Sequence, residues 1–173
     1  MHTLSQILFI FLAYKFGDLR EWKKYQSTLL YVCTLNLLYN FLAANYDLWK
    51  YQPDFYSSHS LTEVGNSIFL LPAISFIFLS NYPEEHTQKK VLFYYVKWIV
   101  GSILVESVFV YFDKITFHHG YKFWMEPAFY FLMYTFIRLH FKHPLLTYFL
   151  SGLVVVGFIW IFDVPITTPI GER

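Results

Sequence analysis

The chain has 173 residues, of which 56% are hydrophobic, 23% aromatic and only 14% charged, and its formal net charge is +1. Soluble domains carry about 25% charged residues, so this composition argues against a water-soluble globular protein. A near-neutral chain without an Arg/Lys-rich tract gives no electrostatic reason to expect a nucleic-acid partner. The lone cysteine, Cys33, lies in an apolar run and can form neither an internal disulfide nor a thiol-based metal site.

The first apolar run, residues 3–16, is short for a membrane span, because a hydrocarbon core of roughly 30 Å takes about 20 helical residues. The run lacks the basic leader and the small-residue cleavage site of a signal peptide. Residues 7–14 also show no polar face that would hold a helix in the membrane interface. We therefore expect a short inserted helix with Lys15 reaching the membrane surface.

Five longer apolar runs follow, each close to the length of a membrane span. Barrel strands are excluded because they would show strict alternation over about ten residues. The sequence therefore predicts one all-α domain, an integral membrane bundle of five to six transmembrane helices, with six favoured and the first one short. The expected helices cover residues 3–16, 26–46, 60–80, 91–112, 121–141 and 144–162. Pro72 lies inside one of them and should either kink it or be accommodated by a neighbour.

Lys and Arg are distributed unequally between the two expected sides of the membrane, with nine on one side and four on the other. The positive-inside rule assigns the richer side to the cytoplasm. The expected cytoplasmic loops are 17–25, 81–90 and 139–143, and the expected outer loops are 47–59 and 113–120. Histidines in the cytoplasmic turns stand near lysines and are expected to be solvated: His86, His140 and His143.

Five polar residues from four expected helices come to nearly the same depth in the outer part of the membrane when each helix is given its 1.5 Å rise per residue. This candidate polar layer consists of Asn40, Glu63, Asn66, Glu106 and Glu126. Within the layer, Glu126 is expected to lie close to Glu63. A layer of this kind is the first place to look for function, because ionisable residues inside a bilayer are usually functional or paired.

Glu106 is the costliest member of the layer, since a charge at the centre of a membrane helix costs about 2.5–3.5 kcal/mol on insertion scales. One interpretation is an outward-opening site for an ion, a proton or a small ligand. The other is a carboxyl hydrogen-bonded to Asn40 or Asn66, which holds helices together. Asn36 shares a helix face with Asn40, and both are expected to bridge helices.

A metal site is the weaker alternative for the outer side. His59 and Glu63 stand four residues apart on one helix face, and with His118 and His119 they offer ligands of the types that bind transition metals. Adjacent histidines rarely both point inward, and no H-E-x-x-H motif is present. We therefore expect no metal and no cofactor.

Three stretches of the chain form a recognisable pattern. They are Asp47-Leu48-Trp49-Lys50-Tyr51-Gln52-Pro53, then Asn81-Tyr82-Pro83 with Pro72 before it, and the helix bearing Glu106 followed by residues 118–124. In order and spacing these resemble an uncharacterised family of small multi-pass membrane proteins from endospore-forming Gram-positive bacteria. The resemblance covers about residues 1–141, and the helix over 144–162 departs from it. It implies a bacterial cytoplasmic membrane and makes Trp49 and Glu106 recurrent positions, but it supplies no activity.

Three functions remain open from the sequence. The favoured one is a non-enzymatic membrane bundle that binds a lipid or protein partner, including a second copy of itself. The second is a small transporter or an ion- or proton-coupled protein that uses Glu106. The third is a membrane-embedded enzyme that acts on lipid with carboxyl and histidine groups as acid, base or metal ligands.

Overall fold

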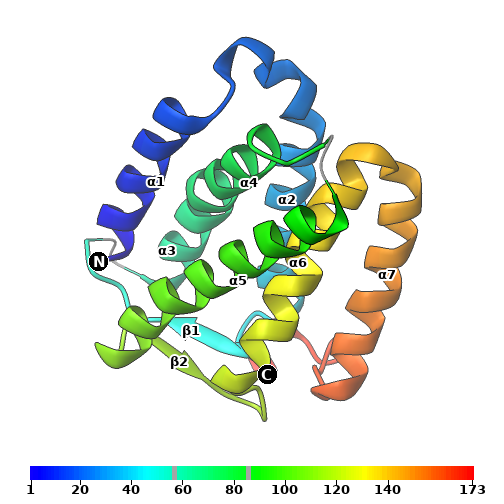
Figure 1. The fold of residues 1–173 in the computed structure, drawn as a ribbon. Coiled ribbons are helices and arrows are strands. Elements are labelled where there is room, and N and C mark those ends of the chain that lie inside the picture. The colour runs from blue at the N-terminus through cyan, green and yellow to red at the C-terminus, as the bar shows by residue number, and fades with distance from the viewer. Residues whose placement is uncertain (56–57, 85–86) are drawn as a thin grey trace.

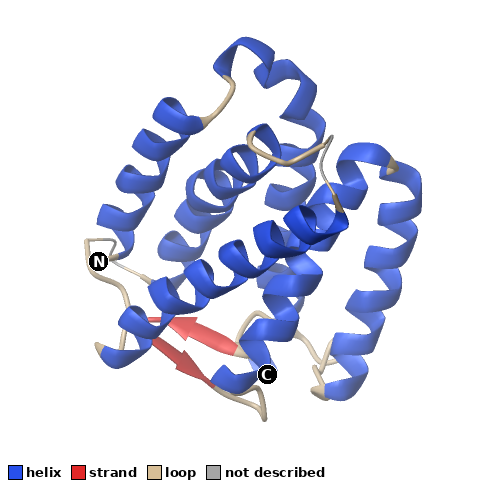
Figure 2. Cartoon of the chain, in the orientation of Figure 1, coloured by secondary structure: helices blue, strands red, loops and turns tan. Residues whose placement is uncertain are grey.

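The apolar runs form six helical rods in the computed structural model, which describes residues 1–55, 58–84 and 87–173 (Figures 1 and 2). Three rods are long and apolar enough to cross a membrane: residues 59–80, α5 and α7. The helices are α1 (His2–Phe16), α2 (Trp22–Leu42), α3 (His59–Gly65) continued through a π-helical segment (Asn66–Leu70) into α4 (Leu71–Ser80), α5 (Gln88–Tyr111), α6 (Glu126–Lys142) and α7 (Pro144–Ile161).

Three predicted helix boundaries were wrong by four or five residues: the start of α6 and both ends of α2, which ends at Leu42 rather than residue 46. Helix α2 begins at Trp22 rather than residue 26, because Lys23 and Lys24 are good helix formers and continue the helix into the loop. Helix α6 begins at Glu126 rather than residue 121, after a 3-10 turn over Phe123–Met125. Proline is favoured in the first turn of a helix, and the first turn of α6 carries one.

The rod over residues 59–80 accommodates Pro72 through the π-helical segment just before it. Proline lacks an N–H and its ring collides with the carbonyl four residues earlier in a regular α-helix. The wider turn moves that carbonyl away, and the N–H of Leu71 bonds to the carbonyl of Asn66. A local change of winding therefore accommodates Pro72, where the sequence analysis had left open a kink or accommodation by a neighbour.

The bundle has two ends (Figure 1), and the basic residues of the loops are distributed unequally between them. The connections α1–α2, α4–α5 and α6–α7 are at one end, and most lysines and arginines of the expected cytoplasmic loops lie in the helix turns beside them. At the other end, near both chain termini, a short antiparallel pair joins β1 (Trp49–Tyr51) to β2 (Ile115–Phe117), with Tyr51 opposite Ile115. We call this second end the strand end. The sequence analysis had assigned both strands to loops, because three-residue strands are too short for a pattern.

Aromatic side chains from α2, α4 and α6 form the centre of the bundle. Phe78 and Tyr134 are completely buried, with their ring centroids 4.8 Å apart. Trp98 of α5 contacts both rings edge-on or tilted, at 5.7 and 5.6 Å. Such offset and edge-on contacts are the favourable arrangements for aromatic pairs.

The outer faces of α5 and α7 expose large apolar side chains along their whole length. Leu104 is 62% exposed, Phe149 66% and Val156 63%. Monomeric soluble proteins rarely expose continuous apolar areas of this extent. These faces suit contact with lipid.

Helix α1 packs closely against α4 at Gly17, immediately after its last turn. A Cβ atom on this glycine would lie 2.2 Å from Cε1 of Phe76 and 2.5 Å from the backbone oxygen of Ala13. Because only a hydrogen fits there, the glycine fixes how closely the end of α1 approaches α4.

An ion-pair cluster ties the α4–α5 connection to α6. A carboxyl oxygen of Glu84 accepts a hydrogen bond from Nη2 of Arg138 at 2.7 Å and lies 3.1 Å from Nζ of Lys142. The hydrogen bond from Arg138 is the main reason that the pKa of Glu84 is lowered from 4.5 to about 2. A lowered carboxyl pKa stabilises the fold above about pH 4.5 and loses its contribution as the pH falls toward 2.

Glu84→Gln is therefore expected to lower the free energy of unfolding modestly at pH 7, by about 0.2–1 kcal/mol, because the pair is partly exposed and screened. The difference from wild type should shrink as the pH falls to 3. Reversible unfolding in mixed micelles at both pH values measures it. A difference that grows on acidification would contradict the assignment.

Candidate functional site

The strand end places aromatic rings over the interior of the bundle. The ring of Trp49 stacks on Tyr39 of α2, with centroids 4.1 Å apart, and meets Tyr121 edge-on at 5.3 Å. The backbone N–H of Leu48 donates to the Tyr39 hydroxyl at 3.1 Å, which fixes the start of β1 on α2. The pairing of β1 with β2 thus places these three rings, which we call the aromatic cover, over this end of the bundle.

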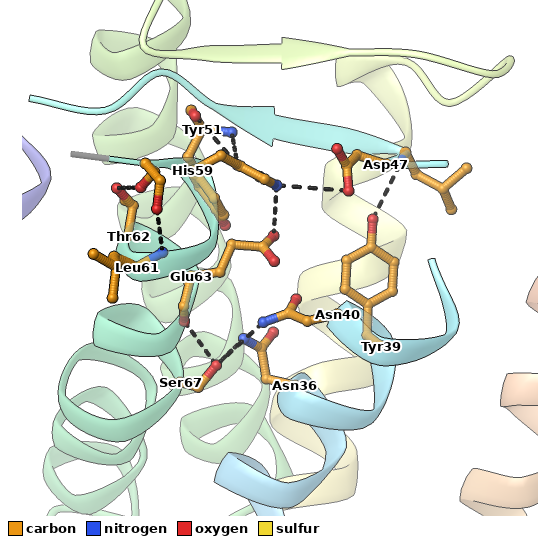
Figure 3. Close-up of polar contacts among 12 residues, drawn as sticks. Asn36, Tyr39, Asn40, Asp47, Tyr51, His59, Leu61, Thr62, Glu63 and Ser67 are labelled. Carbon is orange, nitrogen blue, oxygen red and sulfur yellow. Dashed lines mark hydrogen bonds and ion pairs between the residues drawn. The ribbon is translucent and has the colours of Figure 1, made fainter. Parts of the chain in front are cut away.

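The asparagines of α2 bridge to the π-helical segment (Figure 3). Asn36 and Asn40 both donate to the hydroxyl oxygen of Ser67, at 2.7 and 3.5 Å, and Ser67 donates to the backbone oxygen of Glu63 at 2.8 Å. This is the helix-bridging role expected of the two asparagines. Asn66 takes a different partner, since its side-chain oxygen accepts from Gln6 of α1 at 2.9 Å.

Glu63 lies in a second group, with His59 and Asp47 (Figure 3). The backbone N–H of Tyr51 donates to Nδ1 of His59 at 3.0 Å, so Nε2 faces the two acids. Nε2 is 3.5 Å from a Glu63 oxygen and 3.6 Å from an Asp47 oxygen. Glu63 thus pairs with His59, whereas its expected neighbour Glu126 is paired elsewhere.

The histidines proposed for a metal site have separate partners. His118 bonds through Nε2 to the Thr116 hydroxyl at 2.9 Å, and His119 stacks on Tyr46 with centroids 3.6 Å apart. Within residues 1–55, 58–84 and 87–173, no group of three or more His, Cys, Asp or Glu side chains could hold a metal ion.

Glu106 and Glu126 form a buried carboxyl pair. Glu106 of α5 is 9% exposed and Glu126 of α6 is 3% exposed, and their carboxyl groups are in hydrogen-bonding contact. Tyr130 donates its hydroxyl to Glu106 at 3.0 Å. Glu106 therefore bonds to α6, where the sequence interpretation had offered Asn40 or Asn66 as its partner.

The polar layer is therefore divided into two groups of carboxyls with Tyr51 near both. Burial, followed by the charges of Glu63, Glu106 and Glu126, raises the pKa of the Tyr51 hydroxyl well above its ordinary value. The phenol consequently stays neutral over the physiological pH range and can donate a hydrogen bond. The rise per residue placed these residues in one layer from the sequence, but it could not predict which of them pair.

A partly open cavity of about 260 Å³ runs between α2, α6 and α7. Its walls are mostly apolar, and on α2 the lining residues extend from Tyr31 to Leu42, which is about 17 Å at 1.5 Å per residue. At the strand end it is lined by Glu106, Glu126 and aromatic rings of the aromatic cover. An elongated apolar cavity with a few polar groups at one end is typical of ligand sites.

The opposite end of the cavity carries a polar cluster that the sequence analysis missed. The hydroxyls of Tyr31 and Ser151 are 2.7 Å apart, and both residues line the cavity. His140 stacks on Tyr31 at 4.1 Å, and its Nδ1 bonds to the Thr28 hydroxyl at 3.0 Å. His140 is only 2% exposed, so the expectation that it is solvated was wrong.

The other two histidines of these turns have different outcomes. His143 is exposed, as expected. His86 lies outside the described residues. The signal that could have identified His140 is its spacing from Ile137 and Tyr134, since residues three and six positions before it belong to the buried face of α6.

Comparisons of the chain with protein-family models, with curated proteins and with solved structures found no match.

Proposed function

We propose that the protein is an integral membrane bundle that binds one lipid-like amphiphile in the cavity between α2, α6 and α7. The observation that carries the proposal is the shape and lining of this cavity, which is apolar along its length and ends at the Glu106–Glu126 pair. An apolar chain fits the walls, and a polar head group fits the carboxyl end. This is a specific form of the lipid-binding bundle favoured from the sequence.

The exposed apolar faces support insertion of the whole bundle. Residues 59–80, α5 and α7 have the length and composition of spans, and all six rods run between the same two ends (Figure 1). We propose that α1, α2 and α6 also insert, with α1 as a short rod of about 22 Å. By the positive-inside rule the strand end then faces outward, and the opposite end, which carries most of the lysines and arginines, faces the cytoplasm. The proposed location is a bacterial cytoplasmic membrane, on the resemblance described above.

The test uses a neutral photoactivatable probe, a dodecanol carrying a diazirine near the end of its chain, with the protein in lipid nanodiscs. Mass spectrometry then maps the labelled residues. We expect labelling of cavity-lining residues such as Phe129 in addition to lipid-facing residues such as Leu153. The neutral head group makes this test independent of the charge of the natural ligand.

Two neighbouring valines of α7 provide a matched pair of variants. Val155 lines the cavity, whereas Val156 is 63% exposed on the outer face. Val155→Phe is expected to reduce labelling of Phe129 at least fivefold, because the added ring occupies the cavity. Val156→Phe should leave it unchanged, and labelling of Leu153 should be the same in both. Equal labelling of Phe129 in the two variants would refute the proposed binding site.

Transport of the ligand is a second candidate function, and it is favoured by the polar cluster at the far end of the same cavity. The Tyr31–Ser151 pair lies on the lining opposite to the Glu106–Glu126 pair. A cavity with polar groups at both ends offers two positions for a head group, as a transport path requires. Movement of an amphiphile between the leaflets of proteoliposomes, measured with and without Val155→Phe, distinguishes transport from binding alone.

A further inference from the structure

The acidic end of the cavity is also its most aromatic part. Tyr39, Trp49 and Phe129 line it together, with Trp49 stacked on Tyr39 and 5.4 Å from Phe129 between ring centroids. The faces of such rings carry partial negative charge, which attracts cations. The rings and the carboxyl groups at this end therefore both attract a cation.

No basic side chain compensates these carboxyl groups in the part of the chain that the structure describes. The ion pairs present there join other residues, and none involves Glu106 or Glu126. Buried ionised groups are normally paired, because an isolated charge in a low-dielectric interior is costly. The two carboxyls are in contact with each other, and a hydrogen bond between carboxyl groups requires a proton from one of them.

We propose that the amphiphile bound in the cavity has a cationic head group, an organic amine or a quaternary ammonium, held between the Glu106–Glu126 pair and the rings of Tyr39, Trp49 and Phe129. This inference rests on the proposed function and adds the charge of the ligand to it. The cation supplies the opposite charge that the pair lacks, and the rings contribute cation–π attraction. An anionic head group would meet like charge in a desolvated site, which is the usual means of rejecting a wrong ligand.

The experiment compares two competitors of equal chain length and opposite charge. Dodecyltrimethylammonium and dodecyl sulfate are each titrated, below the concentration that disrupts nanodiscs, against labelling of Phe129 by the neutral dodecanol probe. We expect the ammonium compound to suppress this labelling at a concentration at least tenfold lower than the sulfate. Labelling of Leu153 on the outer face reports partition into the bilayer and corrects both curves.

The variants locate the charge selectivity. Glu106→Gln with Glu126→Gln keeps the size and hydrogen-bonding capacity of both side chains, and it should reduce the difference between the competitors to less than threefold. Glu126→Gln alone is a second variant in case the double change impairs folding, and it should reduce the difference in part. Glu84→Gln, at the other end of the bundle, should leave the full difference.

The outcomes separate this inference from the proposed function. Equal suppression by both competitors, stronger suppression by the sulfate, or full selectivity in the double variant would overturn the cationic head group while leaving the binding site intact. Labelling of Phe129 that does not respond to Val155→Phe would instead refute the binding site itself.

Discussion

Replacing Phe78 by alanine is expected to lower the free energy of unfolding by about 3 kcal/mol, the largest loss for any single truncation in the bundle. The ring of Phe78 is completely buried and lies within 6 Å, centroid to centroid, of Tyr94, Trp98 and Tyr134. Phe→Ala changes in well-packed cores cost about 3–5 kcal/mol. The lower limit applies here, because a membrane helix separated from its neighbours still has lipid around its apolar side chains.

In the proposed membrane bundle, the loss at Phe78 comes from packing and not from transfer out of water. Removal of the ring leaves a cavity that rigid neighbouring rings cannot fill, and each of them loses dispersion contacts. The measurement is unfolding by sodium dodecyl sulfate in mixed micelles, monitored by circular dichroism. Phe149→Ala, on the 66% exposed face of α7, is the matched control and should change stability by less than about 0.5 kcal/mol. Equal losses in the two variants would show that Phe78 does not lie in the core.

Gly17→Ala is expected to have the second largest effect, a loss of about 1–3 kcal/mol, the usual cost of overpacking. The added methyl group would meet both the ring of Phe76 and the backbone oxygen of Ala13 at less than 3 Å. The ring could move only by disturbing the core around Tyr25, and the backbone oxygen belongs to the last turn of α1. The end of α1 must therefore shift away from α4.

Gly101→Ala provides the control, because a methyl group there meets no atom within 4 Å. Alanine also favours the helix by about 1 kcal/mol relative to glycine, so this variant should be neutral or slightly stabilised. Limited proteolysis at the α1–α2 connection offers an independent readout and should be faster in Gly17→Ala alone. If both variants keep wild-type stability and proteolysis rates, α1 is not packed against α4 as described.

The sequence predicted the six rods because apolar runs of about 20 residues have few other structures available in a bilayer. It did not predict the β1–β2 pair, whose strands are too short for an alternating pattern and depend on contacts between residues about 66 positions apart. It also placed the start of α6 too early, since aromatic residues before Glu126 are apolar enough to extend a run whether or not they are helical.

The polar layer shows the same limit at the level of single side chains. Depth along a helix follows from the rise per residue, and on that ground the sequence analysis placed Glu106 and Glu126 in one layer. Rotation of each helix about its axis was not available from depth, and rotation decides that Glu106 meets Glu126 and that Glu63 meets His59. His140 was misjudged for the related reason that a lysine two residues later suggested water, while its own face of α6 is buried.

The resemblance to a family of small membrane proteins stays a prediction, as do the membrane orientation and the bacterial location. A second copy of the chain or another membrane protein also stays a predicted partner. The orientation, the location and the partner all concern the surroundings of the bundle. The cavity and its acidic end belong to the chain itself and can be tested with purified protein.

A crystal structure grown with 12-bromododecyltrimethylammonium tests the central proposal most directly, because the anomalous signal of bromine locates the end of the chain. We predict a bromine peak inside the cavity between α2, α6 and α7, with the ammonium group against Glu106 and Glu126. Bromine peaks confined to the outer faces of α5 and α7, with the cavity empty, would contradict the proposal.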